Sequence, residues 1–427
     1  MTEFDGSSED LKRALEALRS GVPNRDAVRV LGCSQTDVVQ RFQRQLASVD
    51  ELAMDDRQAG GMLIEGGFGT GKSHVLEYLK HFALEENFVC SLIVVGKESP
   101  LYDPGKIFAA AAEAAVAPGI AGNAIREIAL QMDLSSAKYA GFSRWANDPD
   151  SDISPLFPAT LLLHERLRND PEMDEKVRGF WAGEKLPISD VRQGMRQVGQ
   201  WSAYPIRNVP ARELPPQRFN FVTRLIRAAG FRGWVLLFDE VELIGKYSRL
   251  QRARSYSELT RWMGKVEAEQ FPGLTSVASI TDDYVSAVLV DKHDLDHIGP
   301  LLLSKDTDVY RAMAGRAETG MRVIQRDAML LDPPDDGTLQ TTHDSLKRIY
   351  AGAYNWMPDD LLVARTSVGR RMRSYVRRWI NEWDLKRLYP GQDLETVETE
   401  LKISYAESAE LQTASEISED KSNPDEY

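Results

Sequence analysis

The sequence predicts an α/β fold: a parallel sheet flanked by helices, with a long helical insertion and a C-terminal helical lid. Three observations predict it. A glycine-rich loop stands between an apolar strand and a helical segment at residues 62–82. A second apolar strand ends in two acids, Asp239 and Glu240. The residues between and after these motifs have helical periodicity over several stretches.

Composition places the chain among globular proteins. Its 427 residues suit two to three domains, and 42% hydrophobic and 27% charged residues suit a sizeable core. The two cysteines, Cys33 and Cys90, argue against a disulfide scaffold or a zinc site. The apolar runs are too short to cross a bilayer, and the acidic N-terminus lacks the apolar core of a signal peptide. We therefore expect a cytoplasmic protein with no membrane partner. The net charge of −13 excludes wholesale coating of nucleic acid but permits a local basic patch.

We expect four regions along the chain. They are an N-terminal helical segment with an adenine-side loop (1–50), an ATPase core (51–330) with a helical insertion at about 101–233, a helical lid (331–390) and a tail (391–427). An insertion of this length commonly serves partners or substrate. The tail is acidic and has no apolar periodicity, so we expect it to be disordered.

The glycine-rich loop has the composition of a phosphate cradle. Residues 66–73 fit G-x-x-x-x-G-K-[ST] without a mismatch, between a strand and a helix as the motif requires. The predicted nucleotide-binding residues are Gly66, Gly67, Phe68, Gly69, Thr70, Gly71, Lys72, Ser73 and His74. Lys72 would reach the β- and γ-phosphates and Ser73 would hold Mg²⁺. The motif therefore predicts ATP and Mg²⁺ as cofactors.

The strand at residues 235–238 supplies the acids that hydrolysis needs. Its continuous apolar run is typical of a central parallel strand, and ligands of such sheets bind where the strands end. Asp239 would be the carboxylate on the Mg²⁺ side and Glu240 the group that activates water. Glu242 is a lesser candidate for the second role.

Another buried strand, at residues 275–280, ends in the polar residue Thr281. A crossover helix around residues 256–270 would precede it. In AAA+ ATPases a polar residue at the tip of the strand between the two Walker strands is called sensor 1. Thr281, with Asp282 behind it, resembles that residue. The alternative is an ordinary turn after a strand.

The stretch VLGCSQTDVVQRF has two interpretations. It resembles a helix-turn-helix, with a glycine turn and a capped second helix. It also lies where AAA+ proteins place a loop against adenine, usually apolar-Gly-Arg-Glu, although Cys33-Ser34 replaces Arg-Glu here. We favour the adenine-side loop, with Val22, Pro23 and residues 30–32 as contacts.

The stretch VGRRMRSYVRRWINEWDL predicts a basic amphipathic helix. In AAA+ lids such a helix often carries an arginine that touches the γ-phosphate, called sensor 2. Arg373 is the first candidate for that role and Arg370 the second. The alternatives are that the arginines contact nucleic-acid phosphates, or that they form a solvated face.

Taken in order, these pieces resemble the ATP-binding proteins of BREX-type bacteriophage-defence loci, an AAA+ branch close to origin-recognition-like proteins. The resemblance rests on ALRSGVPNRDAV, GGFGTGKSHVLEYL, GFRGWVLLFDEVELI, LLDPPDD and MRSYVRRWINEWDL, from about residue 11 to 385. It implies nucleotide contacts at Gly66, Gly69, Gly71, Lys72 and Ser73, and Mg²⁺-linked catalysis at Asp239 and Glu240. Met372 departs from the family pattern, which has proline before the sensor-2 arginine.

The resemblance implies a bacterial cytoplasmic ATPase that acts as a switch or motor within a defence complex on or near DNA. The expected partners are other defence-system proteins, duplex DNA and, with ATP bound, further copies of the chain. Arg322 and Arg326 would be the candidate arginine fingers in such an oligomer. The alternatives are an origin-recognition-like DNA-binding ATPase and a nucleotide-binding scaffold without significant turnover.

Overall fold

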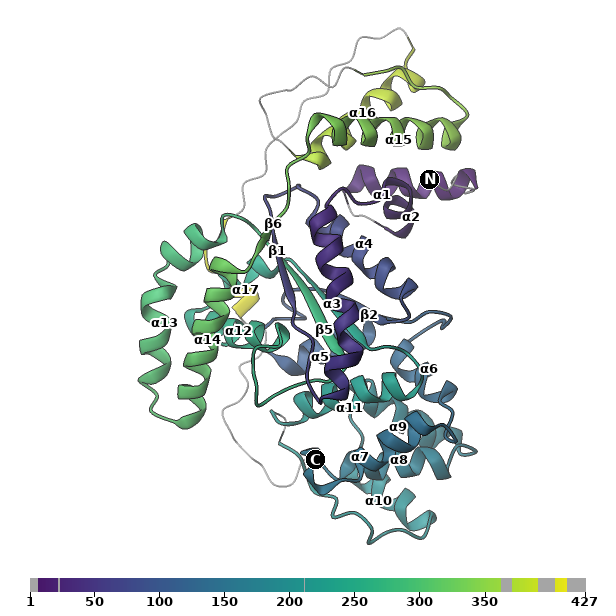
Figure 1. The fold of residues 1–427 in the computed structure, drawn as a ribbon, viewed down its shortest axis with the longest axis vertical. Helices are drawn as coiled ribbons and strands as arrows, with labels where there is room; N and C mark the ends of the chain where they lie inside the picture. Colours follow the sequence, from purple (N-terminus) through teal and green to yellow (C-terminus); the bar gives the residue numbers. More distant parts are fainter. Residues whose placement is uncertain (1–6, 22–23, 211, 362–370, 391–403, 413–427) are drawn as a thin grey trace.

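The computed structural model describes residues 7–21, 24–210, 212–361, 371–390 and 404–412 (Figure 1). The fold is mixed α/β, as the sequence predicts, with a six-stranded sheet in the order β3-β2-β4-β5-β1-β6. Every neighbouring pair is parallel except β2 and β3. The strands are β1 (Met62–Glu65), β2 (Val89–Val94), β3 (Ala115–Val116), β4 (Trp234–Asp239), β5 (Leu274–Ile280) and β6 (Met329–Leu330).

Both faces of the sheet are buried under helices. On β4, Val235 and Leu237 point to a core shared with α3 (Thr36–Met54) and α4 (Lys72–Glu85). The alternate residues of β4 point to the opposite core, because side chains alternate along a strand. That core is shared with α5 (Pro104–Glu113), α11 (Leu214–Ala228) and α12 (Arg249–Trp262). Burial on both faces explains the continuous apolar runs of the central strands.

The strand order brings the sequence motifs to one edge of the sheet. β5 lies between β4 and β1, as expected for the strand that ends at Thr281. Glu65 pairs in register with Ile280, and the N–H of Gly66 donates to the carbonyl of Ile280 at 3.2 Å. The glycine-rich loop, the acids after β4 and Thr281 therefore all follow the carboxyl ends of neighbouring parallel strands, where α/β folds bind ligands.

A helical insertion separates β3 from α11, below the sheet in Figure 1. It contains α6 (Ala124–Gln131), α7 (Ala137–Ala146), η1 (Pro149–Ser151), α8 (Leu156–Arg166), α9 (Pro171–Trp181) and α10 (Ile188–Gln197). α8 begins at Leu156, and most of its residues are buried.

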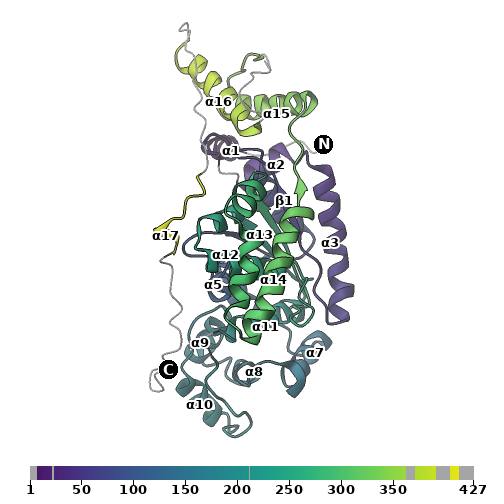
Figure 2. The same ribbon diagram turned by 90° about the vertical axis from the view of Figure 1, so that its left-hand side faces the viewer.

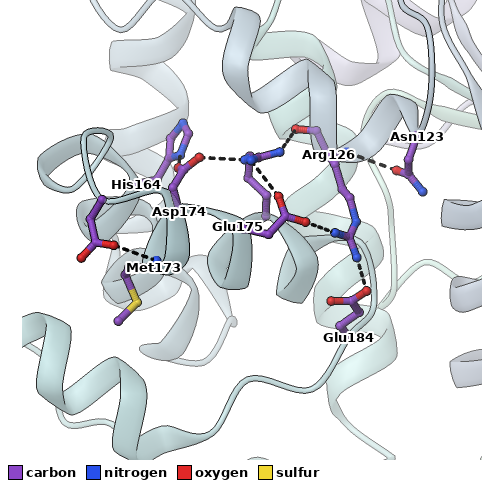
Figure 3. Close-up of polar contacts among 9 residues, drawn as sticks. Asn123, Arg126, His164, Met173, Asp174, Glu175 and Glu184 are labelled. Carbon is purple, nitrogen blue, oxygen red and sulfur yellow. Dashed lines mark hydrogen bonds and ion pairs between the residues drawn. The ribbon is translucent and has the colours of Figure 1, made fainter.

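Charged side chains join the helices of this insertion (Figure 3). Arg126 of α6 forms an ion pair with Glu175 of α9. The carboxylate of Asp174 accepts from His164 of α8 at 2.6 Å and from Nε of Arg178 at 2.8 Å. His164 and Asp174 are buried, so their contacts satisfy polar groups that burial would otherwise leave unpaired.

Beyond β4 the chain continues through η2 (Val241–Lys246) to α12. After β5 it forms η3 (Val285–Val290), a short π-helix. It then forms a hairpin of α13 (Asp294–Leu303) and α14 (Asp308–Arg326), seen at the left of Figure 1. α14 packs along α12, and Gly320 permits a close approach, since a Cβ there would lie 2.0 Å from the carbonyl oxygen of Tyr256.

The lid, at the top of Figures 1 and 2, combines helices from the first described residues with helices that follow β6. Its helices are α1 (Ser8–Ser20), α2 (Arg25–Leu31), α15 (Asp336–Tyr354) and α16 (Met372–Leu388). Leu15 of α1 is buried with Leu346, Trp379 and Trp383 in a core separate from those of the sheet. The apolar face of α1 therefore packs on lid helices, while α3 packs on the sheet.

Part of the tail also packs on the core. Residues 404–412, which include α17 (Ala409–Gln412), lie in the segment expected to be disordered. Tyr405 is only 9% exposed, and Leu411 packs on the edge of the larger core. These two apolar anchors distinguish residues 404–412 from a purely polar tail. The flanking residues 391–403 and 413–427 lie outside the described part of the chain.

Candidate active site

A cavity of about 470 Å³ lies between the sheet and the lid. This volume falls within the range typical of small-molecule sites. The lining residues come from five parts of the chain. They are residues 17, 18 and 21 in α1 and its C-cap; residues 31–35 after α2; residues 69–71 and 73–75 in the glycine-rich loop and α4; residues 332–335, 338 and 342 before and in α15; and residues 372, 373 and 376 in α16. The cavity thus joins the glycine-rich loop to the predicted adenine-side loop and the basic helix.

The backbone of the glycine-rich loop needs its glycines. Gly69 and Gly71 have φ of 82° and 109°, a left-handed conformation that side chains disfavour. A Cβ on Gly66 would lie 2.7 Å from the hydroxyl oxygen of Thr70. α4 begins directly after Gly71, and Ser73 and His74 line the cavity. The amino-terminal end of α4, which attracts anions, therefore faces the cavity.

Lys72 is folded back onto this loop. Its ammonium donates to the carbonyl of Gly66 at 2.7 Å and to that of Gly67 at 3.3 Å, and the residue is 8% exposed. Lys72 is consequently absent from the cavity lining given above. Its side chain must exchange these carbonyls for phosphate oxygens if it is to contact a nucleotide.

The acids after β4 are held in a defined geometry. One carboxylate oxygen of Asp239 accepts from the hydroxyl of Ser279 at 2.6 Å and from the backbone N–H of Glu240 at 3.0 Å. Glu240 has φ of 58°, a left-handed conformation that costs energy for a residue with a side chain. Burial and the neighbouring charge of Asp239 raise the pKa of Glu240. Such strained positions cluster at functional sites.

The carboxylate of Glu242 is more deeply buried than that of Glu240. It is 7% exposed, and its Oε2 atom has no hydrogen-bond partner among the described residues. Burial raises the pKa of Glu242 to about 7, although the positive charge of Lys72 opposes this shift. The sequence pattern gave this residue less weight than Glu240 because its burial depends on how η2 folds under the strand ends.

Replacing Glu242 with glutamine should flatten part of the pH dependence of stability. The pKa rises from 4.5 to about 7 on folding, so the folded protein binds the extra proton between these values. The contribution of Glu242 to the free energy of unfolding is therefore fully present at low pH. It decreases by about 3 kcal/mol in total as the pH rises to about 7.

The measurement is urea unfolding of the metal-free wild type and Glu242→Gln between about pH 5 and about pH 8. As pH rises, the free energy of unfolding of the variant should increase relative to that of the wild type. Parallel pH curves for the two proteins would contradict the assigned shift.

Thr281 does not line the cavity. It is 2% exposed, and its hydroxyl lies 2.6 Å from the phenol oxygen of Tyr405. Asp282, the next residue, lies beside the glycine-rich loop: a Cβ on Gly67 would be 3.4 Å from its carboxylate. The predicted sensor-1 residue is thus at the correct edge of the sheet but its hydroxyl is engaged by the C-terminal segment.

Arg373 lies where the lid meets the glycine-rich loop. Its backbone N–H donates to the carbonyl of Gly69 at 3.3 Å, and its guanidinium lies 5.3 Å from the ring centre of Phe68. Burial lowers the pKa of Arg373, as does the charge of Arg377, while Asp239 and Glu240 act in the opposite direction. Arg373 lines the cavity, and Arg370, the second candidate, lies outside the described residues.

The neighbouring arginines of α16 have other partners. Arg377 donates to the carbonyls of Arg19 and Ser20 at 2.9 and 2.6 Å, and so caps the carboxyl end of α1. Arg378 forms an ion pair with Glu382 at 2.6 Å. Arg377 therefore joins α16 to α1 within the lid, whereas the pair of Arg378 lies within α16 itself.

The loop after α2 closes another side of the cavity. Residues 31–35 line it, and His74 of α4 donates to the carbonyl of Gly32 at 2.7 Å. Burial lowers the pKa of His74, in keeping with a neutral ring that donates this bond. This position favours the adenine-side interpretation over a helix-turn-helix. Val22, Pro23 and the side chain of Val30 lie outside the described part.

Gln35 is a cavity residue that the sequence interpretation missed. Its side-chain amide donates to the carbonyl of Asp332 at 3.0 Å and accepts from the N–H of Asp332 at 2.9 Å. This reciprocal pair ties the loop after α2 to the segment that enters the lid. No local pattern could reveal it, because the two residues are almost 300 positions apart.

The side chains present suit a magnesium ion shared with phosphates. Among the described residues no group of three or more His, Cys, Asp or Glu side chains could hold a metal by itself. Mg²⁺ commonly takes one or two protein ligands and completes its shell with water and phosphate oxygens. Ser73 and Asp239 fit that requirement. Cys33 and Cys90 are free thiols, and no helix of the described segments is long and apolar enough to cross a bilayer.

Comparison with known protein families identifies a relationship. The model of a family described as "BREX system ATP-binding protein BrxC/D" matches residues 7–128 and 217–291. The matched parts contain α1 to α5 and the start of α6, the glycine-rich loop, β4 with its acids and β5 with Thr281. No curated protein and no solved structure matches the chain significantly.

Proposed function

Because the chain belongs to the BREX system ATP-binding protein family, we propose that it is an AAA+ ATPase that binds and hydrolyses ATP with Mg²⁺. It would serve as a switch or motor subunit of a bacterial phage-defence complex acting on or near DNA. One observation carries the proposal. The glycine-rich loop and Arg373 line one cavity between sheet and lid, and Asp239 and Glu240 stand at the same edge of the sheet, at the end of β4, with β5 between β4 and β1.

Each residue has a distinct role in the proposed reaction. The backbone N–H groups of residues 66–74 hold the phosphates, and Lys72 turns from its loop carbonyls toward the β- and γ-phosphates. Ser73 and Asp239 would hold Mg²⁺, and the bound ion would neutralise charge on the phosphates. Glu240 orients the attacking water and accepts its proton.

Two residues would report the state of the γ-phosphate. Thr281, at the tip of β5, is the proposed sensor 1, and Arg373 of the lid is the proposed sensor 2. A cation from the lid at the γ-phosphate would stabilise charge that develops during transfer. It would also make the lid position depend on whether ATP or ADP is bound.

The presence of Glu240 favours a protein that hydrolyses ATP over a scaffold that only binds it. A binding module needs the glycine-rich loop and the metal-side carboxylate, but it has no need of a second acid in a strained conformation. The other defence-system proteins are the proposed partners, and assembly with further copies would supply an arginine finger in trans. The DNA-binding alternative through α16 has less support, since Arg377 and Arg378 are engaged within the lid.

ATP turnover by the purified full chain tests the proposal. We expect Mg²⁺-dependent release of phosphate, measured with and without duplex DNA, and a change in particle mass between the ADP and ATP states if the chain oligomerises. Tight ATP binding without any turnover would support the scaffold instead.

Arg373→Ala should weaken binding of ATP more than binding of ADP. A charge-assisted hydrogen bond to a phosphate contributes about 1.5–3 kcal/mol, so we expect about a ten- to hundred-fold weaker ATP affinity and slower hydrolysis. Titration with both nucleotides measures this difference. Arg378→Ala is the matched control on the same helix, and should leave both affinities unchanged. Equal losses for ATP and ADP in Arg373→Ala would contradict the sensor-2 role.

A further inference from the structure

Residues 404–412 lie against the edge of the core where β5 ends, with α17 beside α12 (Figure 2). The phenol oxygen of Tyr405 is 2.6 Å from the hydroxyl of Thr281 and 2.8 Å from the carboxylate of Asp283. The ring packs over Gly245 of η2, where a Cβ would lie 2.9 Å from it. The missing side chain at Gly245 therefore leaves the space that the ring of Tyr405 occupies.

Several further contacts fix this segment. The ammonium of Lys292 donates to the carbonyls of Tyr405 and Gly245. Glu407 pairs with Arg252 at 3.2 Å, and the N–H of Ser408 donates to the carbonyl of Lys246 at 3.1 Å. These partners come from η2, α12 and the residues after η3, so the segment is docked on the elements that follow both β4 and β5.

The hydrogen bonds of Tyr405 occupy the hydroxyl hydrogen of Thr281. A carboxylate only accepts hydrogen bonds, so the single hydrogen of the Tyr405 phenol is directed at Asp283. The Tyr405 oxygen can then only accept from Thr281, whose single hydroxyl hydrogen is used in that bond. While the segment is docked, Thr281 has no hydrogen left to donate to a phosphate oxygen.

We infer that residues 404–412 are an autoinhibitory strap, in which Tyr405 occupies the hydroxyl of the sensor-1 residue Thr281. ATP hydrolysis then requires the strap to leave, which frees Thr281 for the γ-phosphate. The inference rests on the proposed function, because it takes Thr281 as a γ-phosphate contact. Burial raises the pKa of Tyr405, as do the carboxylate of Asp283 and, to a smaller extent, the charge of Glu242.

Tyr405→Phe tests the hydrogen bond while it keeps the ring. We expect kcat for ATP hydrolysis to rise about three- to ten-fold, the range for one hydrogen bond, with KM nearly unchanged. Thr281→Val should slow hydrolysis, and adding Tyr405→Phe to it should have no further effect. Tyr204→Phe is the matched control, because its phenol donates to Asn147 in the helical insertion. It should behave as wild type.

Glu407→Ala provides a second route to the same result. It removes the pair with Arg252 and leaves Tyr405 and Thr281 intact, so it should also raise kcat. Equal or slower turnover in both Tyr405→Phe and Glu407→Ala would overturn the strap.

Hydrogen exchange of the full chain gives a readout that does not depend on turnover. Amides of residues 404–412 should exchange faster with Mg²⁺ and a non-hydrolysable ATP analogue than with ADP. Unchanged exchange with bound analogue would overturn the strap. If the chain binds ATP without hydrolysing it, the proposed ATPase function fails, while the exchange measurement still decides the strap.

Discussion

Replacing Lys72 with alanine is expected to raise the dissociation constant for ATP by at least about a hundred-fold, the loss of two charge-assisted contacts to phosphate. The reason is the position of Lys72 as the first residue of α4, directly after the left-handed Gly71. From there its side chain can exchange the carbonyls of Gly66 and Gly67 for the β- and γ-phosphates. Calorimetric titration with ATP in the presence of Mg²⁺ measures the effect.

Lys80→Ala is the control for this experiment. Lys80 lies on the same helix and pairs with Glu77 at 3.0 Å, away from the cavity-lining residues. This variant should retain the ATP affinity of the wild type. Micromolar ATP affinity in a folded Lys72→Ala protein would remove the phosphate-cradle assignment. Thermal unfolding without nucleotide checks that both variants fold.

Glu240→Gln is expected to bind ATP normally but to hydrolyse it at least about a hundred-fold more slowly, the contribution of a positioned general base. The amide keeps the size of the side chain and its left-handed backbone, so only the capacity to accept a proton is lost. Single-turnover measurements with saturating ATP separate this step from binding and product release.

Glu242→Gln is the informative comparison, because the two acids are neighbours and both have raised pKa values. If Glu240 is the base, Glu242→Gln should slow hydrolysis much less than Glu240→Gln does. Wild-type turnover in Glu240→Gln combined with slow turnover in Glu242→Gln would transfer the role to Glu242.

The sheet and its motifs could be predicted because their signals are local. A strand buried on both faces gives an unbroken apolar run, as in β4 and β5, and the glycines at 69 and 71 mark a backbone that other residues avoid. The expected placement of Thr281 on a strand between the two Walker strands is confirmed by the sheet order. The roles of these residues in catalysis stay predictions.

Several helices and contacts could not be predicted, for identifiable physical reasons. α8 is buried around most of its circumference, so it lacks the 3.6-residue alternation that reveals a surface helix. The contact between Thr281 and Tyr405 joins residues 124 positions apart, and the fold-back of Lys72 is a choice of rotamer. Neither leaves a pattern in neighbouring residues.

The composition of the lid has a consequence for biosynthesis. α1 is synthesised long before its partners, because Leu346 and Trp379, with which Leu15 is buried, are made more than three hundred residues later. At about 5–20 residues per second, this delay lasts on the order of tens of seconds. During that time the apolar face of α1 has no native partner, so chaperones that bind exposed apolar segments would have a target there. Prematurely terminated chains that lack α15 and α16 would keep that face exposed and should be prone to aggregation and proteolysis.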